Sequence, residues 1–177
     1  AQWGQSVVLL IIDGSVGCTG TLINNTDNDG KPYLLTASHC LNKQFTMKNP
    51  DYEKIAGSIV CFFNFNSPFC DPILRGTEEM STASSYFKAV NEMADMALLE
   101  LTATPPVYYR PYYAGWNAQE VGPAPYTCIQ HPQYSIKRIS ISDEDLAPFT
   151  LTDPNMIFYE NAHWHVKTWE VGYTASG

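Results

Sequence analysis

At residues 34–40 the chain reads Leu34-Leu35-Thr36-Ala37-Ser38-His39-Cys40, an apolar run that leads directly into a histidine and a cysteine. Apolar runs of this kind are typical of buried strands, so we expect His39 where such a strand ends. A histidine can take up and return a proton near neutral pH if a neighbouring group fixes its tautomer. Asp95, directly ahead of a second apolar run at residues 96–101, is the candidate for that group.

Proline and glycine punctuate the 177-residue chain densely, with twelve and eleven residues respectively. Short clusters of Val, Ile, Tyr, Phe and Thr lie between them, and long amphipathic helical runs are scarce. These features favour an all-β sandwich or barrel. Strands are predicted at residues 6–12, 17–23, 33–35, 58–66, 85–90, 96–101, 126–130, 135–141, 156–160 and 163–169.

The segments between these strands include one helical turn and several loops. Pro50 and Asp51 begin a short capped turn that ends at residue 54, and residues 67–83 are predicted to be a polar loop. Residues 104–125 contain five prolines without a clear hydrophobic period. This segment is therefore predicted to connect two units of the chain.

The formal net charge of -8 argues against a nucleic-acid or anionic-membrane surface, because both require a basic patch. No apolar run approaches the roughly 20 residues of a membrane span. Five cysteines without C-x-x-C metal spacing fit an oxidising compartment. We therefore expect a secreted or periplasmic protein that binds neither nucleic acid nor membrane.

Three blocks of the sequence, residues 17–23, 36–40 and 95–101, resemble in order those of chymotrypsin-like serine peptidases. More narrowly, several segments are similar to bacterial lysyl endopeptidases, and together they span nearly the whole chain. They are Leu22-Ile23-Asn24-Asn25-Thr26, residues 33–37, Ala114-Gly115-Trp116, His131-Pro132 and Lys137-Arg138-Ile139-Ser140.

The resemblance implies two six-stranded antiparallel β-barrels with the active site in the cleft between them. Residues 1–103 would form the first barrel, and residues 126–177 would form part of an incomplete second barrel. The family has a triad of His, Asp and Ser in that chain order. His39 would be the general base, and Asp95 would hold its other ring nitrogen and stabilise the imidazolium.

The resemblance also implies a disulfide and a serine nucleophile. Cys18 and Cys40 match the family's disulfide next to the triad histidine, which would anchor the backbone there. The serine is expected just after Gly177, which is similar to the first glycine of the family's Gly-x-Ser-Gly motif. Ser176 is the less favoured candidate for that serine, because Thr174 stands where a glycine is expected two residues earlier. The 177 residues alone should therefore not hydrolyse peptides, and a second chain is a candidate source of the rest of the barrel.

The function implied is that of a serine endopeptidase for protein or peptide substrates, with cleavage after lysine and without a cofactor. Trp169 resembles a family position near the substrate cleft, although burial explains this tryptophan nearly as well. The alternative function is a catalytically inactive binding module that keeps the two-barrel scaffold.

Three further cysteines have no assigned pairing. Cys61, Cys70 and Cys128 allow a Cys61–Cys70 bridge, a bridge to another segment, or free thiols. Because five is an odd number, at least one thiol is free or pairs outside the chain.

No metal site is expected. His163 and His165 alternate on one strand face, but no third ligand follows at a convincing spacing. Residues 27–30 lack the remaining ligands of a calcium loop and are predicted to form a hairpin turn. The aromatic cluster at residues 108–113 is predicted to pack the connector rather than bind a polymer.

Overall fold

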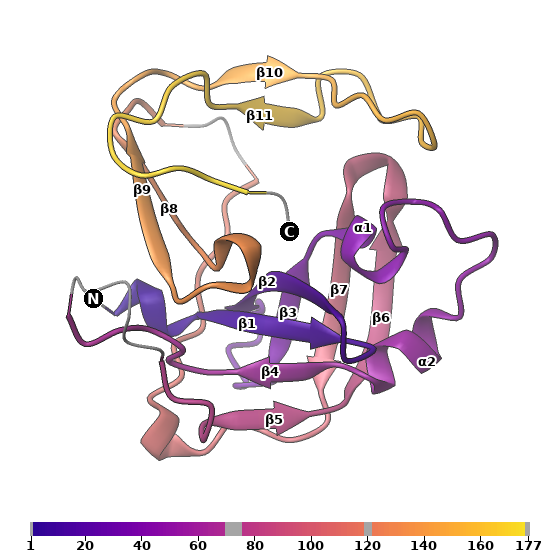
Figure 1. Ribbon diagram of the computed structural model, residues 1–177, viewed down its shortest axis with the longest axis vertical. Helices are drawn as coiled ribbons and strands as arrows, with labels where there is room; N and C mark the ends of the chain where they lie inside the picture. Colours follow the sequence, from indigo (N-terminus) through magenta and orange to yellow (C-terminus); the bar gives the residue numbers. More distant parts are fainter. Residues whose placement is uncertain (1, 70–75, 119–121, 176–177) are drawn as a thin grey trace.

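The computed structural model describes residues 2–69, 76–118 and 122–175, and these residues form mostly short strands (Figure 1). The strands are β1 Val7–Ile12, β2 Val16–Ile23, β3 Tyr33–Thr36, β4 Val60–Phe62, β5 Ser81–Ala83, β6 Ser85–Asn91, β7 Met96–Leu101, β8 Tyr126–Gln130, β9 Arg138–Ser142, β10 Ala147–Phe149 and β11 His163–His165. The helical elements are α1 Ser38–Leu41, α2 Tyr52–Gly57, η1 Trp3–Gln5, η2 Glu92–Ala94, η3 Val107–Tyr109 and η4 Pro132–Tyr134. The all-β prediction is confirmed.

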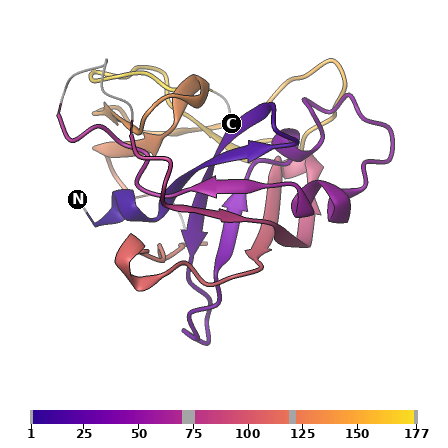
Figure 2. The same cartoon turned by 60° about the horizontal axis from the view of Figure 1, so that its bottom comes forward.

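Strands β1 to β7 form one antiparallel sheet in the order β5-β4-β1-β2-β3-β7-β6. The sheet curls, so that β4 and β5 run across the direction of β3 and β7 (Figures 1 and 2). β1 lies near the middle of the sheet, which explains why its sequence is continuously apolar. Asp13 and Gly14 both have positive φ, 49° and 67°, and they form the predicted tight turn between β1 and β2.

The sheet encloses the main hydrophobic core. Its largest cluster includes Leu10, Leu22, Leu34 and Leu99, which are fully buried. β3 pairs with β7 so that Thr36 lies opposite Ala97. The end of β3 therefore lies beside the start of β7. As a result, the segment that follows β3 and the segment that precedes β7 meet at the same edge of the sheet.

Strands β8 to β11 form two separate two-stranded ribbons, β8–β9 and β10–β11. Figure 1 shows the β10–β11 ribbon as a layer opposite the seven-stranded sheet. Backbone hydrogen bonds join the two parts at two places. Lys137 N–H donates to the Phe65 carbonyl at 3.0 Å, and Tyr159 N–H donates to the Met93 carbonyl at 3.0 Å.

The predicted strand at residues 58–66 is wrong in length, because β4 ends at Phe62. Asn64 takes a positive φ of 53°, which a continuing strand excludes. The side chain of Asn64 instead donates to the Tyr109 carbonyl at 2.7 Å and so ties this bend to η3. The predicted loop at residues 67–83 is also too long, since its end forms β5 against β4.

Three predictions for later and helical segments need correction. Residues 156–160 form no strand, and of these residues only Met156 makes a bridge, to Asp153. The strand predicted at 163–169 ends at His165, where its partner β10 begins. The predicted turn at 51–54 extends to Gly57 as α2, with the Asp51 side chain accepting from Lys54 N–H at 3.1 Å as its cap.

His131 gives the fold a specific sensitivity to acid. Its ring is buried, Nδ1–H donates to the Ser135 carbonyl at 3.0 Å, and Nε2 has no hydrogen-bond partner among the described residues. Burial, with a smaller contribution from the nearby Lys137 charge, lowers the pKa of His131 to about 4. The folded protein therefore keeps this imidazole neutral at pH values where the unfolded chain protonates it.

We expect the free energy of unfolding to fall by about 3 kcal/mol as the pH drops from about 6.5 to about 4. The sign follows because the unfolded chain binds the additional proton in that interval. In His131→Asn this part of the slope should disappear, since asparagine does not titrate and its amide can still donate to the Ser135 carbonyl. Urea unfolding at several pH values measures both slopes, and equal slopes would contradict the assignment.

Candidate active site

His39 lies in α1, the short helix that follows β3 after a single extended residue, Ala37. Its side chain is almost completely buried, with 8 % of the residue exposed. The prediction that His39 follows the end of this strand is confirmed. Because α1 begins at the edge where β3 meets β7, the imidazole is held close to the segment that enters β7.

Asp95 is the last residue before β7, and it faces His39. Its φ of 50° and ψ of 46° are left-handed, a conformation that aspartate adopts more readily than most non-glycine residues. Oδ2 lies 2.7 Å from His39 Nδ1. Oδ1 accepts from the His39 backbone N–H at 2.9 Å and from Ser38 Oγ at 3.0 Å. The carboxylate thus fixes both the ring and the backbone of the histidine.

This geometry defines the charge of Asp95 and the tautomer of His39. Burial opposes ionisation of Asp95, but the hydrogen bonds from His39 and Ser38 outweigh burial and lower the pKa of Asp95. Since an ionised carboxylate only accepts, Nδ1 carries a proton, and the neutral form of the ring has its lone pair at Nε2. Nε2 is buried and has no hydrogen-bond partner among the described residues. The ring can therefore accept a proton at Nε2 while Asp95 stabilises the charge that forms at the ring.

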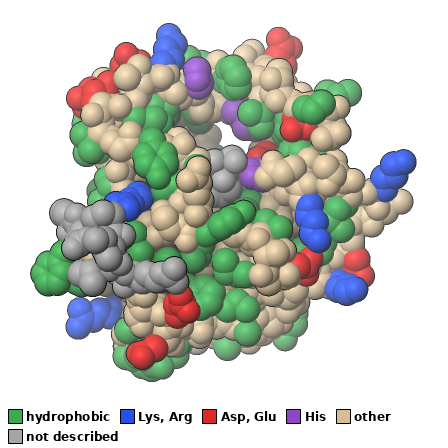
Figure 3. Space-filling model, in the orientation of Figure 1, with side chains coloured by type: hydrophobic (Ala, Val, Ile, Leu, Met, Phe, Trp, Pro, Cys, Tyr) green, Lys and Arg blue, Asp and Glu red, His purple; other side chains and the backbone are tan. Residues whose placement is uncertain are grey.

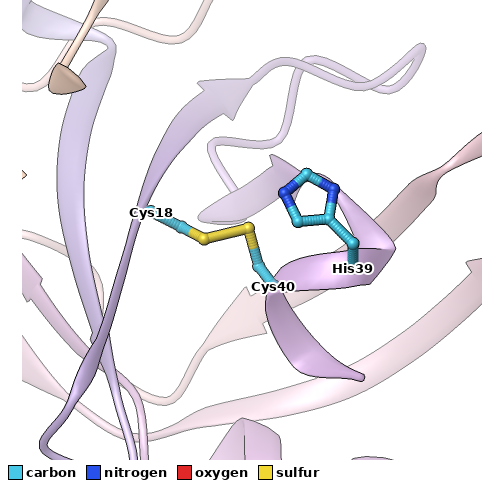
Figure 4. A group of neighbouring side chains, drawn as sticks. All are labelled: Cys18, His39 and Cys40. Atoms are coloured by element: carbon cyan, nitrogen blue, oxygen red, sulfur yellow. A yellow bond between two sulfur atoms is a disulfide. The ribbon is translucent and has the colours of Figure 1, made fainter. Parts of the chain in front are cut away.

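Cys18 and Cys40 form a disulfide beside His39 (Figure 4). Cys18 comes from β2 and Cys40 from α1, so the bond joins the helix that carries the histidine to the sheet. One ligand-type atom of each cysteine and of His39 lies within 4.8 Å of the others. The two sulfur atoms are bonded to each other and are not thiolates, so this group is not a zinc-type ligand set.

Replacing both cysteines, in Cys18→Ala/Cys40→Ala, should lower the free energy of unfolding by about 3 kcal/mol. The bond closes a loop with a sequence separation of 22, and its loss gives the unfolded chain more conformational freedom. Urea denaturation measures the change. Cys128→Ala is the matched control, because its half-buried thiol is free. A double variant as stable as this control would show that the disulfide does not constrain the fold.

Of the remaining cysteines, Cys61 and Cys128 carry free thiols. Burial raises the pKa of Cys61 to about 12 and also raises the pKa of Cys128. Both thiols are therefore weak nucleophiles near neutral pH. Cys70, the third unassigned cysteine, lies outside the described residues, and so do Ser176 and Gly177.

The second part of the chain reaches the histidine through aromatic contacts. Phe45 meets the His39 ring edge-on, with 6.2 Å between centroids, and Phe158 packs against Phe45 at 5.4 Å. Phe158 in turn contacts His163 at 5.6 Å. Figure 3 shows this face hollowed between the β10–β11 ribbon and the seven-stranded sheet, with histidine side chains around the hollow.

Trp169 lies in irregular chain after β11 and is half-buried. No hydrogen bond or ring contact within the described part of the chain joins it to His39 or Asp95. Sequence reasoning also missed three residues at the site, Ser38, Phe45 and Phe158. Ser38 had a signal, because it immediately precedes the histidine, whereas the two phenylalanines are recognisable only once the fold brings them to the ring.

Comparison with known proteins gives consistent results. The family described as the C-terminal domain of lysyl endopeptidase matches residues 2–177. A lysyl endopeptidase of Pseudomonas aeruginosa is 27% identical over 129 residues, which are 72% of this chain and 26% of that protein. The chain thus spans about a quarter of the length of this curated relative.

A solved structure shares the fold. The crystal structure of the Rv3671c protease in its inactive form superposes with a TM-score of 0.52 and 12% sequence identity. The match covers 87% of this chain and 58% of that one. Together with the curled antiparallel sheet, it shows an all-β, chymotrypsin-like fold. Among the described residues, no helix is long and apolar enough to cross a membrane.

Proposed function

Because the chain belongs to the lysyl endopeptidase C-terminal domain family, we propose that it is the catalytic part of a secreted serine endopeptidase that cleaves protein or peptide substrates after lysine. The observation that carries this proposal is the His39–Asp95 pair. The Asp95 carboxylate holds Nδ1 at 2.7 Å, and Nε2 is left without a partner among the described residues. This is the arrangement that a serine hydroxyl needs, because the hydroxyl is a weak nucleophile without an adjacent base.

In the proposed reaction, His39 Nε2 takes the proton of a serine hydroxyl as the serine oxygen attacks the carbonyl carbon of the scissile bond. Asp95 stabilises the resulting imidazolium through Nδ1. His39 then gives the proton to the leaving amine, and the acyl-enzyme is hydrolysed by water with the same base. We propose that the serine follows Gly177 in a Gly-x-Ser-Gly segment of the longer protein.

We also propose that residues 1–103 and 126–177 belong to two barrels joined by residues 104–125. The support is that β1 to β7 form one sheet, whereas β8 to β11 do not join it. In this arrangement Trp169 would line the substrate cleft. Export of the protein is proposed from the presence of a disulfide, which persists in oxidising compartments.

A fluorophosphonate probe tests the proposed function, since it labels serines that an adjacent base activates. We expect the full-length gene product to be labelled at one serine and to cleave peptides after lysine. Pretreatment with the unlabelled probe should lower the rate of cleavage in proportion to the fraction of the serine that has reacted. A folded full-length protein that is neither labelled nor active would instead be the inactive binding module.

A further inference from the structure

An open pocket of about 810 Å³ is lined mainly by residues that follow His39 and precede Asp95 in the sequence. Its walls come from the loop after α1, from the turn before β7 and from the segment after β10. The lining residues are Asn42, Met47, Asn49, Pro50, Tyr52, Val90, Asn91, Glu92, Met93, Met156 and Tyr159. The proposed catalytic chemistry uses none of them.

Two of these walls continue directly from the catalytic pair. Asn42 is the residue after α1 and stands three positions beyond His39. Glu92 begins η2, which ends immediately before Asp95. The third wall is fixed to η2 by the hydrogen bond from Tyr159 N–H to the Met93 carbonyl. The pocket is therefore built on the segments that carry the catalytic pair, and the substrate residues that would reach it are those a few positions from the cleaved bond, since extended chain advances about 3.3 Å per residue.

Glu92 is the one charged side chain among the residues that line the pocket. Its Oε1 accepts from Asn42 Nδ2 at 2.6 Å and from the Tyr52 hydroxyl. Further contacts fix the positions of both donors. Asn42 Oδ1 accepts from Met47 N–H at 3.0 Å. The Tyr52 ring stacks on Phe87, with 5.2 Å between the ring centroids. In the described part of the chain, Oε2 takes no hydrogen bond. The carboxylate of this lining residue is thus held in place through Oε1, and Oε2 is not shared with another described residue.

The remaining lining suits an aliphatic chain. Met47, Met93 and Met156 are flexible, polarisable side chains that adapt to such a chain. We propose that this pocket binds the side chain of a lysine or arginine that flanks the cleaved bond, with its stem against the methionines and its charge at Glu92. This inference rests on the proposed peptidase function and adds a second specificity position to it.

The test compares peptides cleaved at one fixed lysine, with lysine or norleucine placed at one flanking position at a time. Norleucine keeps the aliphatic stem and removes the charge. For the full-length protein we expect kcat/KM to favour flanking lysine about five- to tenfold at one position. In Glu92→Gln this ratio should fall to about one, because the amide keeps an acceptor for Tyr52 and Asn42 but loses the charge.

Glu100→Gln is the matched control. It removes the same charge from the far end of β7, about 17 Å along the strand from Asp95, where Glu100 pairs with Lys88 at 2.6 Å. This variant should keep both the activity and the preference for flanking lysine. An equal loss of preference in both variants would mean a general effect of protein charge and would overturn the assignment to Glu92.

Binding separates this inference from the function on which it rests. His39→Ala protein should bind the flanking-lysine peptide about five- to tenfold more tightly than the norleucine peptide, and adding Glu92→Gln should remove the difference. Cleavage without any flanking preference would overturn the inference and leave the peptidase. Selective binding that depends on Glu92, without cleavage by the unmutated protein, would support the pocket and overturn the peptidase. Equal binding of both peptides overturns the pocket in either case.

Discussion

Replacing His39 with alanine in the full-length protein should lower kcat for peptide hydrolysis by about 10⁵-fold. The variant removes the buried Nε2 that would accept the serine proton, and no other histidine in the described structure hydrogen-bonds Asp95. KM should change much less, because the ring acts on the reaction step rather than on substrate binding. Steady-state kinetics with a lysine-containing peptide measure both constants.

The control for His39→Ala is the folded state of the variant. The disulfide and the Ser38 hydrogen bond to Asp95 stay in place, so thermal unfolding should remain cooperative. A cooperative, folded variant that keeps more than a tenth of the activity would exclude His39 as the general base.

Asp95→Asn should lower kcat by about 10⁴-fold at neutral pH with little effect on KM. The amide can donate to Nδ1, which would place the ring proton on Nε2 and leave no lone pair there for the serine. Asp95 also accepts from the His39 backbone, so some loss of stability is expected as well. Kinetics and urea unfolding of the same preparations separate the two effects.

Acidity provides an independent readout for Asp95. Because its folded pKa is lowered, the stabilisation it provides is present above the ordinary aspartate pKa and is lost as pH falls through the folded value. The unmutated protein should therefore lose stability in acid more steeply than Asp95→Asn.

Ser38→Ala is the graded control for the kinetic effect of Asp95→Asn. It removes one hydrogen bond to Oδ1, leaves the Nδ1 contact in place, and should lower kcat about tenfold or less. Equal losses in the two variants would contradict the special role of the Nδ1 contact.

The pairing of His39 with Asp95 could be predicted because both residues stand at the ends of strongly apolar strands. The register of Thr36 opposite Ala97 then places the two side chains together. The sequence also predicted β1, β2, β7 and β8 within about one residue, since burial on both or alternate faces produces a clear pattern.

The later part of the chain was harder to predict for identifiable reasons. Within residues 156–160, which form no strand, the buried residue is Phe158, and it packs against Phe45 beside the histidine. β10 contains Pro148, which suppresses a strand prediction but is tolerated in a two-stranded ribbon with a free edge. Such contacts depend on tertiary structure and leave no period in the sequence.

The position of the disulfide has a consequence for synthesis. The groups that fix His39 all precede β8 in the chain: the Cys18–Cys40 bond joins β2 to α1, Ser38 begins α1, and Asp95 directly precedes β7. Translation adds about 5–20 residues per second, and the earlier part of a chain generally folds first. Ser38 and Asp95 can thus hold His39 on the first sheet before the later strands fold, and the disulfide can fix this arrangement once the chain is in an oxidising compartment. Proteolytic competence would then appear only with the last part of the domain, which delays self-digestion of the unfinished chain.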